Sequence, residues 1–293
     1  MEVKARIAMI GGSGLTQIEG LRVVEELDLE TPFGKPSDKI TIAEIGGRRV
    51  AFLPRHGRGH RLSPTHVPYR ANIWALKQIG VFWIVTFSAV GSLRLDFEPE
   101  HFCIPDQIID RTTHRPHTFF DDLVVHVANG EPFDGCLRRI LIEACRAEGV
   151  TTHDHGTYLC MEGPAFSTRA ESQMYRILGA DIVGMTANPE AKLAREAEMA
   201  YATVAQMTDY DSWHDSIVTV EEVMGHMKNN IANVHRVIQR LIPMIPLGSE
   251  AASPASSALS LAITTDPSCI GERHREKYEL LLGKYVDFNG HRI

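Results

Sequence analysis

The 293-residue sequence lacks the features that mark several large classes of protein. Its 30 lysine and arginine residues are outnumbered by 37 aspartate and glutamate residues, and the net charge of −7 argues against a surface that binds nucleic acid. No apolar run approaches the roughly 20 residues of a membrane-spanning helix, and the short run 7–10 has neither the length nor the cleavage site of a signal peptide. We therefore expect a soluble cytoplasmic protein that contacts neither membranes nor nucleic acid.

The cysteines form no pattern typical of disulfide frameworks or metal sites. Their number is odd, and no two of them make a CxxC pair. A chain of this length can bury a sizeable core without covalent bridges, so we expect reduced and mostly buried thiols. His153 and His155 stand in an HxH arrangement, but no third ligand has matching spacing, and we interpret them as loop residues. The five cysteines are Cys103, Cys136, Cys145, Cys160 and Cys269.

Short apolar segments alternate with amphipathic segments along most of the chain. The expected strands cover 5–10, 40–45, 49–54, 81–88, 157–161, 181–183 and 201–207. The expected helices cover 69–79, 136–147, 189–199 and 220–241, and a further helix is capped by Ser167 or Thr168 and ends at residue 178. This alternation predicts an α/β fold, a single-domain sandwich with a central mixed, largely parallel β-sheet flanked by helices.

The character of the chain changes after Pro246. Residues 248–262 are rich in serine and alanine, a composition typical of a flexible connector. The charged segment 272–285 is expected to form one helix. We therefore expect a main domain over 1–246 and a C-terminal extension over 247–293.

Three loops that follow expected strands are suited to binding an anion. The glycine-rich loop 11–14 offers backbone N–H groups and a hydroxyl, although such a turn alone more often has no ligand, and it matches neither a dinucleotide-binding nor a P-loop pattern. The loop 55–60 carries two arginines and two histidines, and the arginine fork fits phosphate oxygens; a solvated surface loop is the alternative. The segment 88–92 combines small hydroxyl residues with a glycine, and it also reads as a simple turn. Because ligands gather at the carboxyl ends of strands in α/β sheets, the three loops together favour one phosphate site.

Two carboxylates follow the expected strand 201–207, in the segment Thr208-Asp209-Tyr210-Asp211. Carboxylates two residues apart can point into one pocket, where they accept a hydrogen bond from an exocyclic amine or protonate a ring nitrogen of a base. A helix-capping or metal-binding acidic loop is the alternative, and His214 keeps metal binding open. Trp213 and Phe166 are candidates for stacking on a base, although most aromatic side chains of such a chain lie in the core.

Taken together, these motifs resemble the methylthioadenosine phosphorylases of the trimeric purine nucleoside phosphorylase family. The match runs in order from about residue 5 to about residue 245, and a set of this length is far more specific than any single loop. Ala165 stands where the family commonly has arginine, and the segment after Pro246 has no counterpart in the pattern. The matching segments are 11–14, 55–58, 72–76, 91–93, 105–107, 110–112, 162–164, 166–171, 184–186, 189–190 and 208–213.

The resemblance implies a purine nucleoside phosphorylase-like fold and a role for each residue that matches the family's site. The phosphate-binding residues would be Ser13, Arg55, His56, Ser88, Ala89 and Thr186. Met185 would contact the ribose, Phe166 and Ser167 would line the base pocket, and His60 would lie near the site. Asp209 and Asp211 would hold a 6-aminopurine, with Asp209 near N7 as the catalytic residue. Val220 and Val223 would shape an apolar pocket for the 5′ substituent, which His126 of a neighbouring subunit would approach.

The activity implied by the resemblance is phosphorolysis of 5′-methylthioadenosine to adenine and 5-methylthioribose 1-phosphate. The enzyme would be a homotrimer that needs no metal or organic cofactor, with inorganic phosphate as co-substrate. A carboxylate accepts a hydrogen bond from a 6-amino group but repels a 6-carbonyl group, so the two aspartates favour adenine. Three alternatives remain open: a phosphorylase acting on methylthioinosine or 6-oxopurine nucleosides, a hydrolytic nucleosidase, and a non-catalytic nucleoside-binding protein.

Overall fold

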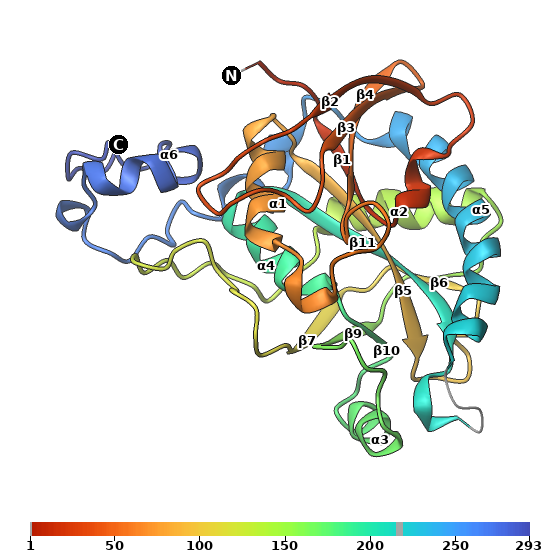
Figure 1. Ribbon diagram of the computed structural model, residues 1–293. Coiled ribbons are helices and arrows are strands. Elements are labelled where there is room, and N and C mark those ends of the chain that lie inside the picture. Colours follow the sequence, from red (N-terminus) through yellow and green to blue (C-terminus); the bar gives the residue numbers. More distant parts are fainter. Residues whose placement is uncertain (1, 215–218) are drawn as a thin grey trace.

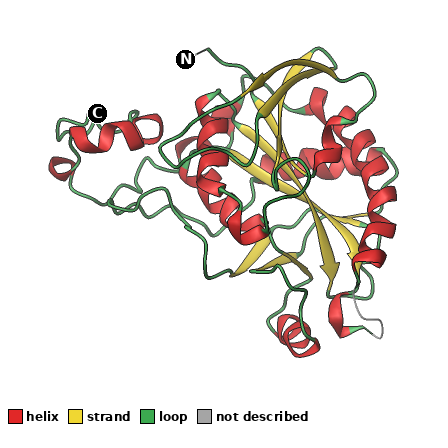
Figure 2. Ribbon diagram, viewed as in Figure 1, coloured by secondary structure: helices red, strands yellow, loops and turns green. Residues whose placement is uncertain are grey.

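The computed structural model describes residues 2–214 and 219–293, without the side chains of residues 13, 16 and 222. Its strands form one 11-stranded mixed sheet, and helices pack on both faces (Figures 1 and 2). The strands are β1 (Ile7–Gly11), β2 (Arg22–Leu27), β3 (Ile40–Ile45), β4 (Arg48–Pro54), β5 (Trp83–Ser92), β6 (Phe102–Cys103), β7 (Gln107–Arg111), β8 (Thr152–His153), β9 (Thr157–Met161), β10 (Ile182–Gly184) and β11 (Ala200–Asp209). The α-helices are α1 (Tyr69–Gln78), α2 (Gly135–Ala147), α3 (Arg169–Ile177), α4 (Ala187–Glu196), α5 (Val220–Met244) and α6 (Arg275–Leu282).

Parallel pairs make up the centre of the sheet. The main path runs β2-β3-β4-β1-β5-β10-β9-β7, and β11 pairs with β5 beside this path. The pairs β4–β1, β1–β5, β5–β11, β10–β9 and β9–β7 are parallel, whereas β2–β3, β3–β4 and β10–β5 are antiparallel. The predicted α/β fold with a mixed, largely parallel sheet is confirmed.

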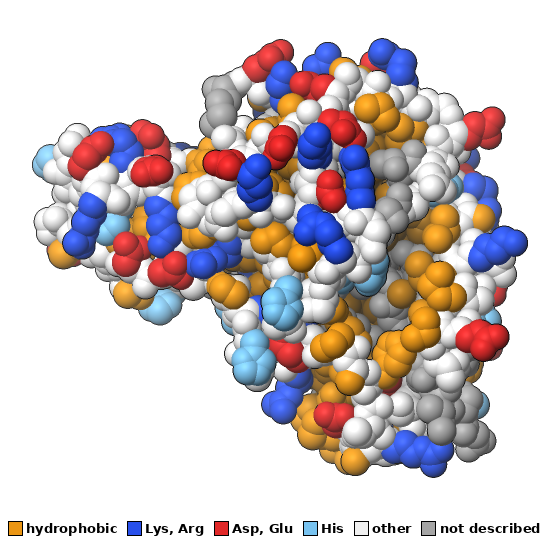
Figure 3. All heavy atoms as spheres, viewed as in Figure 1, with side chains coloured by type: hydrophobic (Ala, Val, Ile, Leu, Met, Phe, Trp, Pro, Cys, Tyr) orange, Lys and Arg blue, Asp and Glu red, His pale blue; other side chains and the backbone are white. Residues whose placement is uncertain are grey.

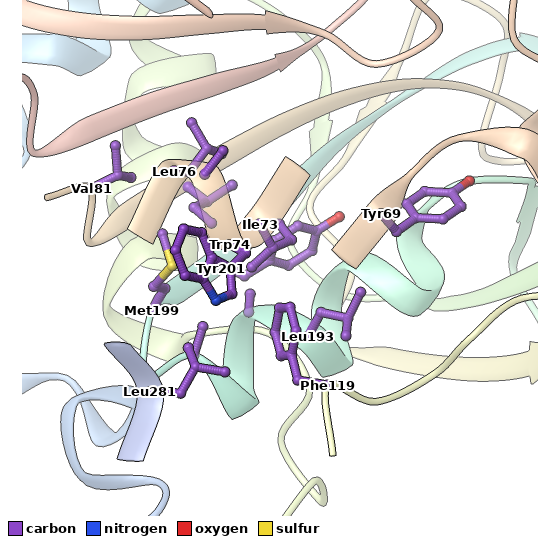
Figure 4. Packing of buried hydrophobic residues seen from close by; sticks show 14 of the residues in the cluster. Tyr69, Ile73, Trp74, Leu76, Val81, Phe119, Leu193, Met199, Tyr201 and Leu281 are labelled. Atoms are coloured by element: carbon purple, nitrogen blue, oxygen red, sulfur yellow. The ribbon is translucent and has the colours of Figure 1, made fainter. Parts of the chain in front are cut away.

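Successive side chains of β1 point to opposite faces of the sheet, so the strand contributes to two hydrophobic clusters, one on each face. Ala8 and Ile10 join a cluster built with α1 and α4, and Ile7 and Met9 join a cluster built with α2 and α5. Figure 4 shows the first cluster, where the rings and branched chains of α1 pack against α4 and β11. Because both faces of β1 are covered, its sequence reads as the continuous apolar run typical of a central parallel strand.

Local sequence signals explain several boundaries. Gly46 and Gly47 adopt positive φ values of 58° and 73°, which close the tight hairpin between β3 and β4. At the start of α3 the cap is Thr168 rather than Ser167, because its side chain accepts from the Glu171 N–H while the Glu171 carboxylate accepts from the Thr168 N–H. The hydroxyl and the carboxylate therefore satisfy two backbone donors at the helix end.

Four strands were not predicted, and the start of α4 was predicted two residues too late. β6 and β8 have two residues each and carry no periodicity, while β2 is largely exposed and charged, as edge strands often are. β7 lies at the end of the main path and is only partly buried. α4 was expected to start at Pro189, but its first residue is Ala187, and Asn188 keeps an extended backbone with φ −112° and ψ 140°.

The serine- and alanine-rich segment after Pro246 is not the free connector that its composition suggests. It contains 3-10 turns at Glu250–Ala252 and Pro254–Ser257, and Leu259 is fully buried in the cluster built with α1 and α4. The helix expected over 272–285 is shorter: α6 follows a 3-10 turn, Glu272–His274, and ends at Leu282. Although α6 projects to one side of the sheet in Figure 1, its Tyr278, Leu281 and Leu282 are buried in the same cluster.

Candidate active site

A cavity of about 410 Å³ opens at the carboxyl ends of the central strands. Its walls come from the last residues of β5, β10 and β11, from the loops that follow β1 and β4, and from one side of α5. This is where ligands bind in α/β sheets, because the loops at that edge converge there. Figure 3 shows the face of the molecule that is hollowed beside α5, with hydrophobic side chains along the hollow.

The structure brings most of the predicted site residues together in this cavity. His126 and Val220 do not line it; Val220, at the first position of α5, is 67% exposed. The side chain of Ser13 lies outside the described part of the chain, but its neighbours Gly12 and Gly14 line the cavity. The predicted residues that line the cavity are Arg55, His56, His60, Ser88, Ala89, Phe166, Ser167, Met185, Thr186, Asp209, Asp211 and Val223.

Arg55 is held rigidly at the end of β4. Its Nε and Nη2 donate to the two carboxylate oxygens of Glu190 at 2.6 and 3.0 Å, and its Nη1 donates to the Phe87 carbonyl at 2.9 Å. The arginine is 3% exposed and the glutamate is fully buried. Burial alone would lower the pKa of Arg55, but the adjacent Glu190 carboxylate outweighs it and raises the pKa, so the guanidinium stays charged. A fixed cation thus forms part of the cavity wall.

Two hydroxyl groups lie side by side near this cation. Ser88 Oγ is 3.1 Å from Thr186 Oγ1 and 3.3 Å from the hydroxyl of Tyr158, which is fully buried. Hydroxyl groups that share a hydrogen bond can turn their protons toward an incoming anion. Burial, followed by the charge of Arg55, lowers the pKa of His56 to about 4, so its imidazole is neutral at neutral pH. This part of the cavity therefore offers one charged donor group, Arg55, and several neutral groups.

The two aspartates line the same cavity further along the sheet, where Asp209 pairs with Gly91, three residues beyond Ser88 on β5. Asp209 accepts a hydrogen bond from Thr208 Oγ1 at 2.8 Å and, through its other oxygen, one from the Asp211 N–H at 2.8 Å. Asp211 is buried, and among the described residues no donor reaches its Oδ2 within hydrogen-bond geometry. Burial raises the pKa of the Asp211 carboxyl. A ligand that donates a hydrogen bond there would satisfy this oxygen.

An apolar wall runs along α5 between the polar groups and solvent. Val223, Met227, Ile231 and Val234 lie on one side of this helix, as its periodicity predicted, and all four line the cavity. Phe87 and Val90 of β5 also line the cavity. Phe166 is 44% exposed at the rim of the cavity, so its ring is free to cover a ligand.

Sequence reasoning missed several residues of the site. Gln206 and Thr208 on β11 line the cavity, and Glu190 and Tyr201 lie behind Arg55. Glu190 had stood out within the Pro189-Glu190 motif, but nothing in the sequence assigned it a role. Gln206 had no signal, because an isolated polar residue in an apolar strand does not reveal what it faces.

The metal-binding interpretation of the acidic loop has no cluster to support it in residues 2–214 and 219–293. No three histidine, cysteine, aspartate or glutamate side chains of this part of the chain are grouped as metal ligands. In the same residues, no helix is long and apolar enough to cross a membrane.

Comparison with known proteins places the chain in a family. A family model described as the phosphorylase superfamily matches residues 6–243. The S-methyl-5′-thioadenosine phosphorylase of Synechocystis sp. is 50% identical over 97% of this chain and 88% of the relative. The enzyme of the same name from Hyperthermus butylicus is 52% identical over 83% of this chain and 90% of the relative.

Solved structures extend the similarity to three dimensions. A methylthioadenosine phosphorylase from an antarctic soil metagenomic library matches with a TM-score of 0.91 at 45% identity, over 96% of this chain and all of the other. A methylthioadenosine phosphorylase from Schistosoma mansoni, solved in complex with adenine, matches with a TM-score of 0.84 at 32% identity, over 89% of this chain and 99% of the other. The chain therefore belongs to the phosphorylase superfamily and, within it, to the group of S-methyl-5′-thioadenosine phosphorylases.

Proposed function

We propose that this chain cleaves 5′-methylthioadenosine with inorganic phosphate and releases adenine and 5-methylthioribose 1-phosphate. One observation carries the proposal: a single cavity holds a fixed arginine with neighbouring hydroxyl groups and, further along β5 and β11, two buried carboxylates. The first group suits an oxyanion, and the second suits the hydrogen-bond donors of a 6-aminopurine. The relatives described above support the same activity.

Phosphate is assigned to the end of the cavity that contains Arg55, Ser88 and Thr186, with His56, Ala89 and the loop around Ser13 beside it. Cleavage of the N-glycosidic bond builds positive charge on the ribose, and a phosphate held below C1′ stabilises this charge and then captures the sugar. Because the Arg55 guanidinium is fixed before the reaction, it needs little reorganisation when the charge develops. Met185 is assigned to the ribose, and His60 also lines the cavity.

The purine is assigned to the opposite end, between Phe166 and Ser167 and the two aspartates. As the bond breaks, negative charge develops on the base, and a proton shared between Asp209 and N7 neutralises the leaving purine. The 6-amino group donates to the carboxylates of Asp209 and Asp211, which a 6-carbonyl group cannot do. This difference in hydrogen bonding selects adenine over hypoxanthine and guanine.

The 5′ substituent is assigned to the apolar wall that α5 provides. Val223 already lines the cavity of one chain, whereas Val220 and His126 do not. We propose that the chain works as a cytoplasmic homotrimer, in which His126 reaches the cavity of a neighbouring subunit. Light scattering on the purified protein tests the assembly: a mass of three chains supports it, and a monomer that retains full activity contradicts it.

Adenine release from 5′-methylthioadenosine, measured with and without inorganic phosphate, tests the activity. Methylthioinosine and inosine are run beside it to test the base preference. We expect release only with phosphate, and slow cleavage of both 6-oxo substrates. Release without phosphate would identify a hydrolase, preference for methylthioinosine or inosine would identify a 6-oxopurine enzyme, and binding without turnover would identify a non-catalytic protein.

A matched pair of arginine variants tests the assignment of the phosphate end. Arg58 lies three residues after Arg55 in the same loop, but its guanidinium faces outward and pairs with Glu26. We expect R55A to lose phosphate-dependent cleavage, whereas R58A should keep it. Equal losses in both variants would contradict the role given to Arg55.

A further inference from the structure

Behind Arg55 lies a buried chain of hydrogen bonds that the proposed reaction does not use directly. The Tyr201 hydroxyl donates to Glu190 Oε2 at 3.0 Å and lies 3.0 Å from Thr86 Oγ1. Glu190 in turn accepts from Arg55 through both of its oxygens. Thr86, Tyr201 and Glu190 are each no more than 2% exposed, and none of the three lines the cavity. This series of hydrogen bonds therefore reaches a ligand in the cavity through Arg55.

The pairing with Glu190 determines which donors Arg55 has left for a ligand. A guanidinium has five N–H groups in a fixed plane. Glu190 takes one on Nε and one on Nη2, and the Phe87 carbonyl takes one on Nη1. One N–H on Nη1 and one on Nη2 remain available to a ligand in the cavity that Arg55 lines.

The charge of the pair makes orientation more important than attraction. The Arg55 cation and the Glu190 anion compensate one another, so the two together offer an incoming phosphate little net positive charge. What they offer is direction, because a guanidinium held at two edges cannot rotate away. Burial and the neighbouring Glu190 raise the pKa of Tyr201 well above its ordinary value, so its hydroxyl keeps its proton and remains a donor.

We propose that Glu190, itself held by Tyr201, is a positioning residue that fixes the orientation of the Arg55 fork and thereby sets the affinity for phosphate. This inference rests on the proposed function. Glu190 and Tyr201 do not line the cavity, yet they would set the affinity for phosphate and leave the binding of the nucleoside unchanged.

The variant Y201F tests the inference, because it removes one hydroxyl and preserves the shape of the ring. Y285F is a matched control, since the Tyr285 hydroxyl also donates to a buried glutamate, Glu198, and neither residue lines the cavity. E190Q tests the central residue, because an amide cannot accept from both donor groups of Arg55. For each protein, the KM for phosphate and the KM for methylthioadenosine are measured separately. The Kd for phosphate alone is taken from the rise in melting temperature with phosphate concentration.

We expect Y201F to raise the KM and the Kd for phosphate about 10-fold, and E190Q to raise them about 100-fold, since hydrogen bonds to charged groups are the strong ones. The KM for methylthioadenosine should change less than about 3-fold in both, and Y285F should leave all three constants unchanged. A purely structural role would lower the melting temperature of Y201F without moving the Kd for phosphate, and that result would overturn the inference. Equal increases in both KM values would also overturn it. Wild-type cleavage without phosphate is a different failure, because it would remove the proposed function itself.

Discussion

Replacing Asp209 by asparagine should invert the base preference of this enzyme, because the surrounding hydrogen bonds determine which way the new amide points. In the wild-type protein one oxygen of Asp209 accepts from the Asp211 N–H and the other accepts from Thr208 Oγ1. A backbone N–H can only donate, so the amide oxygen must stay on that side. The amide NH₂ then faces Thr208, whose hydroxyl can reverse its role and accept. The variant therefore fits the site, but it presents a donor where the aspartate presented an acceptor.

The size of the effect follows from the two roles that Asp209 loses. A hydrogen bond to a charged group is worth about 1.5–3 kcal/mol, which corresponds to roughly 10- to 150-fold. Loss of a positioned proton carrier costs roughly 10²- to 10⁴-fold. We therefore expect kcat/KM for methylthioadenosine to fall at least about 10³-fold in D209N. Methylthioinosine, whose 6-carbonyl accepts from the new NH₂, should become the better substrate.

The assay follows adenine and hypoxanthine release from the two nucleosides at saturating phosphate. D96N serves as the control, because Asp96 is exposed and pairs with Arg94 on the surface. The KM for phosphate should be the same in all three proteins, since the change lies at the purine end of the cavity. If D209N retains methylthioadenosine cleavage within 10-fold of the wild type, the reasoning about Asp209 is refuted.

Three further predictions concern packing and pH. A Cβ at Gly91 would lie 2.9 Å from Asp209 Oδ1, so G91A should displace this carboxylate and lower kcat/KM about 100-fold, and an unchanged value would refute the contact. Leu241, near the carboxyl end of α5, is fully buried, so L241A should lower the free energy of unfolding in urea by about 2–5 kcal/mol, and a loss below 1 kcal/mol would contradict its burial. Burial raises the pKa of Glu196 to about 7, so the folded state holds a proton that the unfolded state releases above its ordinary pKa of about 4.5. Its contribution to stability is complete below pH 4.5 and is lost as the pH rises through 7. Between pH 4 and 8, the free energy of unfolding measured in urea should fall by about 3 kcal/mol more in the wild type than in E196Q. Equal decreases in the two proteins would show that Glu196 does not titrate this way.

Most of the layer structure of this fold was predictable, because it depends on patterns that are local in the chain. β3, β4, β9 and the long helix α5 were predicted to within a few residues, since each carries a continuous apolar run or a helical period bounded by turn residues. The carboxyl-end loops were predicted as anion loops for the same reason. They lie in one cavity, as the general behaviour of parallel sheets requires.

The remaining features depend on contacts between distant parts of the chain. Arg55 and Glu190 are 135 residues apart, and no local signal pairs them. The composition of 248–262 favoured a connector because serine and alanine are also the residues of flexible linkers. Leu259 nevertheless lies in the core, since a single large apolar residue among small ones is enough to anchor a segment whose neighbours fit closely.

The hydrophobic cluster around α1 joins residues that are far apart in the sequence, and this affects how the protein folds during its synthesis. This cluster joins Ala5, near the first residue, to Phe288, near the last, and Leu281 and Leu282 of α6 pack within it. A ribosome releases the amino-terminal part first, so the apolar sides of α1 and α4 emerge long before the segment that covers them. Until residues 281–288 emerge, the nascent chain exposes an apolar surface that is prone to aggregation. The core on this face of the sheet is therefore completed only after the segment that carries α6 has been made.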